Sequence, residues 1–273
     1  MPVLRDILEA TRERVRELTP RRAALERAAA VAPAAPPWSA PFAAGTVGVI
    51  AEVKRRSPSA GLIAPALDPA RLAHDYARGG AAAISVLTDT PHFGGSLADL
   101  EAVRHAVALP VLRKDFLIDP LQLLEARAAG ASAVLLIVRI LDPAELRALS
   151  RLARDLGLAR LVEIHSRAEL DRAVGLAPEA IGVNSRDLDT LRVALDASGP
   201  LLAEIPEGIL AVAESGISSR ADVTHLAASG ADAVLVGTAV ARAADPVAAV
   251  AALAGVPRGA PGAIRPRAWA ATS

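Results

Sequence analysis

The sequence predicts an α/β fold in which eight parallel strands and their helices close into a single barrel. Short, almost wholly apolar segments alternate along the chain with segments of helical periodicity. Strands that are apolar on both faces are typical of a buried parallel sheet. The length of 273 residues also suits one such barrel, which typically needs ~250 residues. Together these observations favour a (β/α)8 TIM barrel over an open, doubly wound sheet.

The elements follow from the apolar pattern and from the glycines between segments. We predict strands over residues 49–53, 83–87, 111–114, 133–138, 161–164, 180–183, 209–213 and 233–236. Helices are predicted over residues 69–79, 97–107, 120–129, 143–156, 167–174 and 220–229. Gly80, Gly130, Gly157 and Gly230 stand where a helix ends before the next strand, as C-cap glycines do. No strand is followed by a Gly-x-Gly-x-x-Gly or Walker sequence, which argues against a dinucleotide-binding or P-loop fold.

The two ends of the chain differ from the barrel. Residues 3–31 have apolar positions at helical spacing and predict a helix, and a Pro/Ala-rich linker follows over 32–41. The Gly/Pro/Ala-rich segment from 255 onward predicts a disordered tail. The predicted organisation is therefore a helical N-terminal extension with its linker (1–46), the barrel (47–254) and the tail (255–273).

Composition excludes several classes of function. Lys+Arg and Asp+Glu both number 30, so the net charge is +0 and no overall field favours nucleic acid or an anionic membrane. Aromatic residues make up 2% of the chain, too few for a base-stacking surface. Cysteine is absent, which excludes disulfides, thiolate nucleophiles and Cys-ligated zinc. The first twenty residues lack a signal-peptide core and no apolar run could span a bilayer, so we expect a cytoplasmic protein.

Charged residues gather at the ends of the predicted strands, where barrels carry their chemistry. Glu52 and Lys54 share one face of the first strand, Lys114 ends the third, Glu163 lies in the fifth and Glu214 ends the seventh. One interpretation is a structural ion pair near the barrel axis. The other is an acid–base site, in which burial beside a second cation lowers the pKa of a lysine.

Small residues follow the last two strands. Ser215-Gly216 and Gly237-Thr238 expose backbone N–H groups where barrels commonly bind phosphate, although either pair alone is equally an ordinary turn or helix cap. The five histidines show no metal-binding spacing, and His165, two residues after Glu163, has no assigned role.

Six segments closely resemble the motifs of the indole-3-glycerol phosphate synthase family. They are 52–61 (EVKRRSPSAG), 85–89 (SVLTD), 93–97 (FGGSL), 112–116 (LRKDF), 184–188 (NSRDL) and 213–217 (AESGI). They occur in order at the expected strand ends, the resemblance runs from about residue 47 to 253, and a helical N-terminal extension is also typical of the family.

The resemblance implies a carboxy-lyase of tryptophan biosynthesis with a small phosphorylated substrate. That substrate is 1-(o-carboxyphenylamino)-1-deoxyribulose 5-phosphate, and the products are indole-3-glycerol phosphate, CO2 and water. No cofactor, metal, nucleic acid or membrane is implied, and we expect a monomer.

The resemblance also implies a role for each matching residue. Lys114 would be the general acid, Lys54 would hold the substrate carboxylate, Glu163 would act as base or electrostatic stabiliser, and Glu52 would position the lysines and assist dehydration. Which lysine acts in which step stays open. The substrate-binding residues would be Asn184 and Glu214 at the hydroxyls and anilino region, Arg186 near the carboxylate, Phe93 and Phe116 on the aromatic ring, and Ser57, Ser215, Gly216, Gly237 and Thr238 around the phosphate.

Some positions depart from the commonest family pattern. Ser185 stands where a second Asn is frequent, Thr238 where Ser is frequent, Ser166 where an acidic residue is usual, and Leu121 where Tyr is often found. None removes a proposed catalytic group, but together they leave room for a paralogue in another pathway. There are three alternatives. The first is phosphoribosylanthranilate isomerase, for which we expect an acid–base pair that includes a cysteine. The others are the α subunit of tryptophan synthase and a catalytically silent barrel that binds a ligand or a partner.

Overall fold

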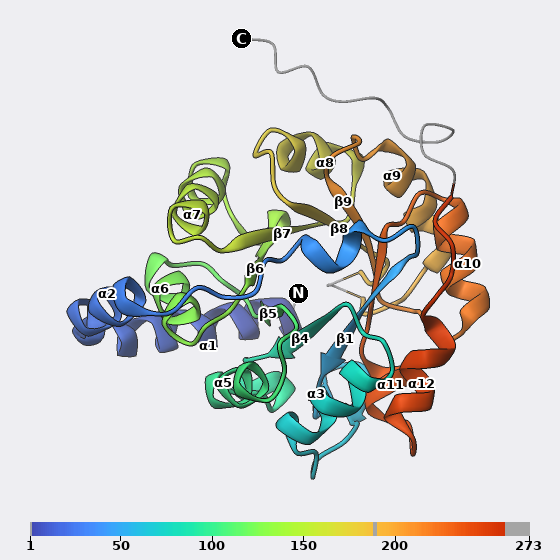
Figure 1. The fold of residues 1–273 in the computed structure, drawn as a ribbon. Coiled ribbons are helices and arrows are strands. Elements are labelled where there is room, and N and C mark those ends of the chain that lie inside the picture. Colours follow the sequence, from blue (N-terminus) through green and yellow to red (C-terminus); the bar gives the residue numbers. More distant parts are fainter. Residues whose placement is uncertain (1, 188–189, 260–273) are drawn as a thin grey trace.

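The predicted barrel is confirmed in a computed structural model that describes residues 2–187 and 190–259 (Figure 1). Eight parallel strands form a closed barrel in the order β1-β10-β9-β8-β7-β6-β5-β4, so each strand pairs with its neighbours in the chain and the last returns to the first. The strands are β1 Gly48–Val53, β4 Ala83–Leu87, β5 Val111–Lys114, β6 Ala133–Ile137, β7 Ala159–Ile164, β8 Ala180–Asn184, β9 Leu210–Glu214 and β10 Ala233–Val236.

Helices surround the strands. They are α3 Pro69–Arg78, α5 Leu97–Ala106, α6 Pro120–Ala128, α7 Pro143–Asp155, α8 Arg167–Val174, α9 Gly199–Glu204, α10 Arg220–Ala228 and α12 Pro246–Leu253, with the one-turn helices α4 Thr90–Phe93 and α11 Thr238–Ala241. Every strand and helix that was predicted for the barrel has an observed counterpart whose bounds lie within two residues of the predicted ones. The prediction did not include α4, α9, α11, α12 or the small hairpin of β2 Arg56–Ser57 and β3 Gly61–Leu62, which are too short or too uniform to show a period.

Helix starts explain why the boundaries could be predicted. Asp68, Asp119, Asp142 and Asp245 each precede a proline, and each aspartate side chain accepts a backbone N–H of the first turn. At the other end, the predicted C-cap glycines have left-handed backbone conformations, as at Gly130 with φ 82°.

Side-chain alternation divides the apolar residues of the strands into two layers. Residues such as Val49, Ala51 and Val53 face outward and pack beneath the helices. Residues such as Ile50 and Leu112 face inward and fill the barrel. The next inward position after Ile50 is Glu52, because side chains on one face repeat every second residue.

The predicted single helix over 3–31 is wrong, because the structure has two helices there. They are α1 Pro2–Leu18 and α2 Arg22–Val31, joined by the short 3-10 turn η1 Thr19–Arg21. Pro20 lies in the turn, and its missing N–H and its ring prevent a continuous α-helix. The two helices pack on α6 through Leu18, Leu25 and Leu121.

The predicted linker after α2 forms the floor of the barrel. It crosses the N-terminal end of the strands on its way to β1 (Figure 1). Trp38 and Phe42 are both buried, with ring centroids 5.5 Å apart, and they pack with the inward-facing Ile50. Gly48 makes room for this packing, since a Cβ there would lie 2.5 Å from the Phe42 ring. No pattern in the sequence pointed to this role.

The tail does not begin at residue 255 as predicted. Val256 is buried and its carbonyl accepts the N–H of Val47 at 2.8 Å, and Arg258 donates to the Thr46 carbonyl. These contacts hold residues 256–258 against the segment before β1. The rest of the predicted tail, 260–273, lies outside the described residues. Within the described residues, no helix has the length and apolar character to cross a membrane.

Candidate active site

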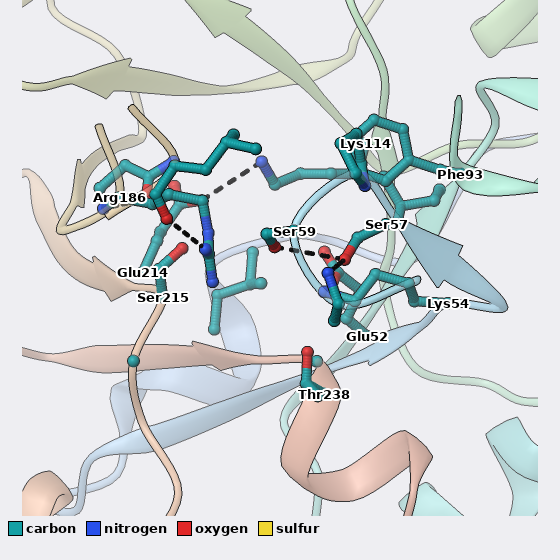
Figure 2. Close-up of a pocket in the computed structure, with 18 of the residues that line it drawn as sticks. Glu52, Lys54, Ser57, Ser59, Phe93, Lys114, Arg186, Glu214, Ser215 and Thr238 are labelled. Carbon is teal, nitrogen blue, oxygen red and sulfur yellow. Dashed lines mark hydrogen bonds and ion pairs between the residues drawn. The ribbon is translucent and has the colours of Figure 1, made fainter. Parts of the chain in front are cut away.

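A cavity of about 640 Å³ opens at the C-terminal ends of the strands. All of the residues predicted to form the site line it: Glu52, Lys54, Ser57, Phe93, Lys114, Phe116, Glu163, Asn184, Arg186, Glu214, Ser215, Gly216, Gly237 and Thr238. Figure 2 shows Glu52 and Lys54 on one side of the cavity and Glu214 and Arg186 on the other.

Lys114 lies between two buried carboxylates. Its Nζ is 3.0 Å from Glu163 Oε2 and 3.3 Å from Glu214 Oε2. The three side chains come from the ends of β5, β7 and β9, so the curvature of the barrel brings them together. The expected acid–base cluster is therefore present as a geometric arrangement.

The charges in this cluster correct one expectation. Burial opposes the positive charge of Lys114, but Glu163, Glu214 and Glu52 outweigh burial, and the pKa of Lys114 is raised rather than lowered. The expected neighbouring cation, Lys54, has its own partner, since its Nζ is 2.7 Å from Glu52 Oε1. Lys114 is thus an ammonium group in the substrate-free protein.

The two carboxylates beside Lys114 differ in their protonation. Burial and the neighbouring Glu163 raise the pKa of Glu214 to about 8, even though Lys114 opposes the shift. Burial also disfavours the charge of Glu163, but Lys114 and His165 outweigh it and lower the pKa of that carboxyl. Near neutral pH one carboxyl group carries a proton and the other is ionised, as in sites that separate an acid from a base.

Two glycines provide space for the charged groups. A Cβ at Gly182 would lie 2.0 Å from Glu214 Oε1, and one at Gly237 would lie 2.4 Å from Glu52 Oε1 and 2.6 Å from Lys54 Nζ. All three distances are far below van der Waals contact, so these positions accept no larger residue without moving the charged groups. Gly237 therefore does more than expose a backbone N–H.

The predicted phosphate-binding residues all line the cavity. Ser215 and Gly216 have φ values of 68° and 80°, a left-handed turn directly after β9. Thr238 begins α11 after β10, and Ser57 faces the cavity from the turn after β1. Sequence analysis missed Arg242, which lines the same cavity and donates to the Ala60 carbonyl at 3.1 Å.

The apolar side of the cavity includes the N-terminal helix. Phe93 and Phe116 have ring centroids 6.2 Å apart. Val3, Leu4 and Ile7 of α1 line the cavity beside them. The helix therefore covers part of the site, a role that its amphipathic pattern alone could not distinguish from packing on the barrel.

Arg14 holds this helix to the strand that carries Lys114. Its guanidinium donates to Asp115 Oδ2 at 3.2 Å and to Glu125 Oε2 at 2.8 Å. The fully buried Arg113 binds the same two oxygens, at 3.0 and 2.8 Å. A network that joins α1, β5 and α6 thus flanks Lys114 on both sides in sequence.

The other predicted residues have local partners. Asn184 Oδ1 accepts the N–H of Arg186 at 3.0 Å, and the Arg186 guanidinium donates to the Leu191 carbonyl at 2.9 Å.

The chain has only two lysines, Lys54 and Lys114, and both lie in the cavity. Among the described residues, no three His, Asp or Glu side chains are grouped to hold a metal ion.

The fold of this chain is similar to that of several solved structures. The thiamine phosphate pyrophosphorylase from Pyrococcus furiosus superposes with a TM-score of 0.58 at 18% identity, covering 76% of this chain and 93% of that chain. The 3-hexulose-6-phosphate synthase from Salmonella typhimurium gives a TM-score of 0.60 at 17% identity, covering 76% and 96%. At these identities the similarity concerns the fold alone.

The sequence comparisons are more specific. An indole-3-glycerol phosphate synthase from Nocardioides sp. is 50% identical over 258 residues, covering 94% of this chain and 99% of the relative. One from Mycobacterium ulcerans is 47% identical over 253 residues, covering 92% and 93%. The profile of the family described as indole-3-glycerol phosphate synthase matches residues 4–253. This chain belongs to the indole-3-glycerol phosphate synthase family.

Proposed function

We propose that the cavity closes and decarboxylates 1-(o-carboxyphenylamino)-1-deoxyribulose 5-phosphate to give indole-3-glycerol phosphate, CO2 and water. The observation that carries the proposal is the Lys114 ammonium held between one ionised and one protonated carboxyl group. Such a trio can donate a proton at one point of the cavity and accept one beside it.

Binding divides the substrate between two sides of the cavity. The turns at Ser215-Gly216 and Gly237-Thr238, with Ser57, bind the phosphate through N–H and hydroxyl groups. The aromatic ring packs on Phe93 and Phe116. Binding energy from these two distant groups orients the reacting carbons between them.

Residues near the carboxylate and hydroxyls fix the reacting end. Lys54 and Arg186 supply positive charge for the substrate carboxylate. Asn184 and the protonated carboxyl of Glu214 hydrogen-bond the hydroxyls and the anilino nitrogen.

Ring closure then depends on Lys114. The ring carbon that bears the carboxylate attacks the ketone carbon, and Lys114 donates a proton to the ketone oxygen as the new bond forms. The bond to CO2 breaks and its electron pair restores the aromatic ring. Loss of the hydroxyl group as water requires one proton at that oxygen and the removal of another from the new five-membered ring. Glu163, whose lowered pKa keeps it ionised, accepts that proton, and Glu52 assists by holding Lys54 in place.

The reaction is tested by incubating the purified chain with the substrate and following indole absorbance and fluorescence. We expect product from the wild type and a kcat lower by about 10²–10⁴-fold in Lys114→Ala, the usual contribution of a general acid. Lys54→Ala, the matched variant of the other lysine, is expected to raise KM more than it lowers kcat.

The outcomes separate the alternatives. A folded wild-type protein that binds the substrate without forming product would identify a binding barrel or a diverged paralogue, and attention would turn to Ser185. Unchanged turnover in Lys114→Ala would remove Lys114 from the mechanism. Thermal unfolding of each variant shows whether the fold is retained.

A further inference from the structure

His165 is a buried titratable residue that the proposed mechanism does not use. It follows β7 directly, and its side chain is only 6% exposed. Its Nε2 lies 3.7 Å from Glu163 Oε1, and its Nδ1 lies 3.7 Å from Glu169 Oε2. Among the described residues, neither ring nitrogen has a hydrogen-bond partner. The two carboxylates therefore flank the ring at ion-pair distance rather than at hydrogen-bond distance.

The flanking carboxylates are themselves held in place. Glu169 Oε2 accepts the backbone N–H of His165 at 2.6 Å, and its other oxygen lies 3.8 Å from Nε of Arg139. Glu163 uses its second oxygen for Lys114 at 3.0 Å. Cations and anions therefore alternate from the surface to the cavity in the order Arg139, Glu169, His165, Glu163, Lys114.

This arrangement decides the charge of the ring. A neutral imidazole has one N–H and one lone pair, so one nitrogen would present its lone pair to a carboxylate oxygen. Only the imidazolium, with two N–H groups, suits both neighbours. Burial opposes that charge and Arg139 also does so, but Glu169 and Glu163 outweigh them and raise the pKa of His165.

We propose that His165 is a positioning residue: held as an imidazolium between Glu163 and Glu169, it fixes the Glu163 carboxylate against the Lys114 ammonium. The proposal rests on the proposed function, since Glu163 is taken as the group that accepts a proton there. His165 touches no substrate in this role. It acts by keeping Glu163 ionised and by holding Oε1 of that carboxylate toward the ring, so that Oε2 faces Lys114.

The pH dependence follows from the sign of these interactions. A positive His165 favours the ionised form of Glu163 and so lowers the pKa of that carboxyl. Removing the charge lets that pKa rise. Activity that needs ionised Glu163 is then lost at a higher pH as the solution is acidified.

The kinetic test is His165→Gln, which keeps a polar side chain but cannot carry charge. We expect the acidic limb of the kcat profile to move to higher pH by on the order of one unit, a roughly tenfold loss of kcat at pH values on that limb, with little change in KM. Glu169→Gln leaves the ring but removes its outer anion, and should move the limb in the same direction by less. His225→Gln, at an exposed histidine beside Asp196, is the matched control and should leave the profile unchanged.

A spectroscopic test does not require turnover. With five histidines in the chain, ¹H–¹⁵N spectra of the imidazole rings assign His165 by its absence in His165→Gln. We expect an imidazolium signal at pH 7 in the substrate-free protein. A neutral ring at that pH, or a folded His165→Gln whose acidic limb does not move, would overturn the proposal. If the wild type forms no product, the proposed function fails instead. The ring signal and the ¹³C titration of the Glu163 carboxyl, with and without His165, still show whether His165 is charged and whether its charge lowers the pKa of Glu163.

Discussion

The two ends of the barrel interior carry opposite kinds of side chain on the same strands. At the N-terminal end, Trp38 and Phe42 close an apolar interior. On β1, β5, β7 and β9 the inward position two residues further along is charged, as the following pairs show: Ile50 and Glu52, Leu112 and Lys114, Leu161 and Glu163, Val212 and Glu214. The apolar core and the charged residues of the cavity are therefore only two residues apart along these strands.

This difference separates stability from activity along the barrel axis. Burial of the apolar floor stabilises the fold. The buried charges at the other end cost desolvation energy that their ion pairs offset only in part. We therefore expect variants of the floor to lower stability with little effect on turnover. Variants of the inward-facing charged residues should lower turnover without a comparable loss of stability.

The largest effect on stability is expected at the floor. Trp38→Ala would leave a large cavity beneath the barrel and cost about 3–5 kcal/mol of unfolding free energy. The kcat of the molecules that remain folded should be close to that of the wild type. Denaturant unfolding and active-site titration measure the two quantities. A large loss of kcat with unchanged stability would contradict the separation.

At the charged end, Glu214→Gln should increase stability while reducing activity. Burial raises the pKa of Glu214 to about 8, so the folded protein keeps a proton that an unfolded carboxyl loses near its ordinary pKa of about 4.3. The wild type thus loses stability as the pH rises from about 4.3 through 8, and glutamine abolishes that loss. We expect a gain on the order of 1–3 kcal/mol above pH 8, shrinking toward pH 5.

The measurement is thermal unfolding across that pH range for wild type and Glu214→Gln. The same variant should lower kcat/KM about tenfold or more, because an amide replaces a carboxyl that binds substrate. Parallel stability profiles for the two proteins would show that Glu214 is ionised in the native state.

A smaller effect is expected where α1 is tied to the charged end. Arg14→Met removes the bonds from α1 to Asp115 and Glu125, which keep Arg113 as a partner, so the cost should be about 1–2 kcal/mol. Because α1 lines the cavity, KM should rise several-fold while kcat changes little. Arg5→Met, at an exposed arginine of the same helix, is the control. Equal KM values in both variants would show that the helix does not depend on this network.

Much of this could be predicted because the signals are local. Apolar runs, Asp-Pro helix starts and glycine C-caps defined the strands and helices. Polar strand ends and the family motifs indicated the site residues, and all of the residues indicated in this way line the cavity. The remaining features depend on contacts between distant segments. Arg14 and Glu125 are far apart in the sequence, and nothing local shows that a buried Trp38 closes the barrel.

The direction of the Lys114 pKa was wrong for the same reason. The expectation counted a neighbouring cation, but Glu52 neutralises Lys54, and three carboxylates act on Lys114. Likewise, the spacing of His165 from Glu163 could be read from the sequence, whereas Glu169 on its other side could be assigned only from the folded chain.

The distribution of lysine has a practical consequence. Since Lys54 and Lys114 are the only lysines, and every other Lys+Arg position is an arginine, the side-chain amines of this chain all lie inside one cavity. An amine-reactive label, such as a mild acylating or reductive-methylating reagent, can then attach to a side chain only within the site. Mass spectrometry of the peptides that contain Lys54 and Lys114 would count occupied cavities, since any ligand that protects the two amines removes the mass added to these peptides.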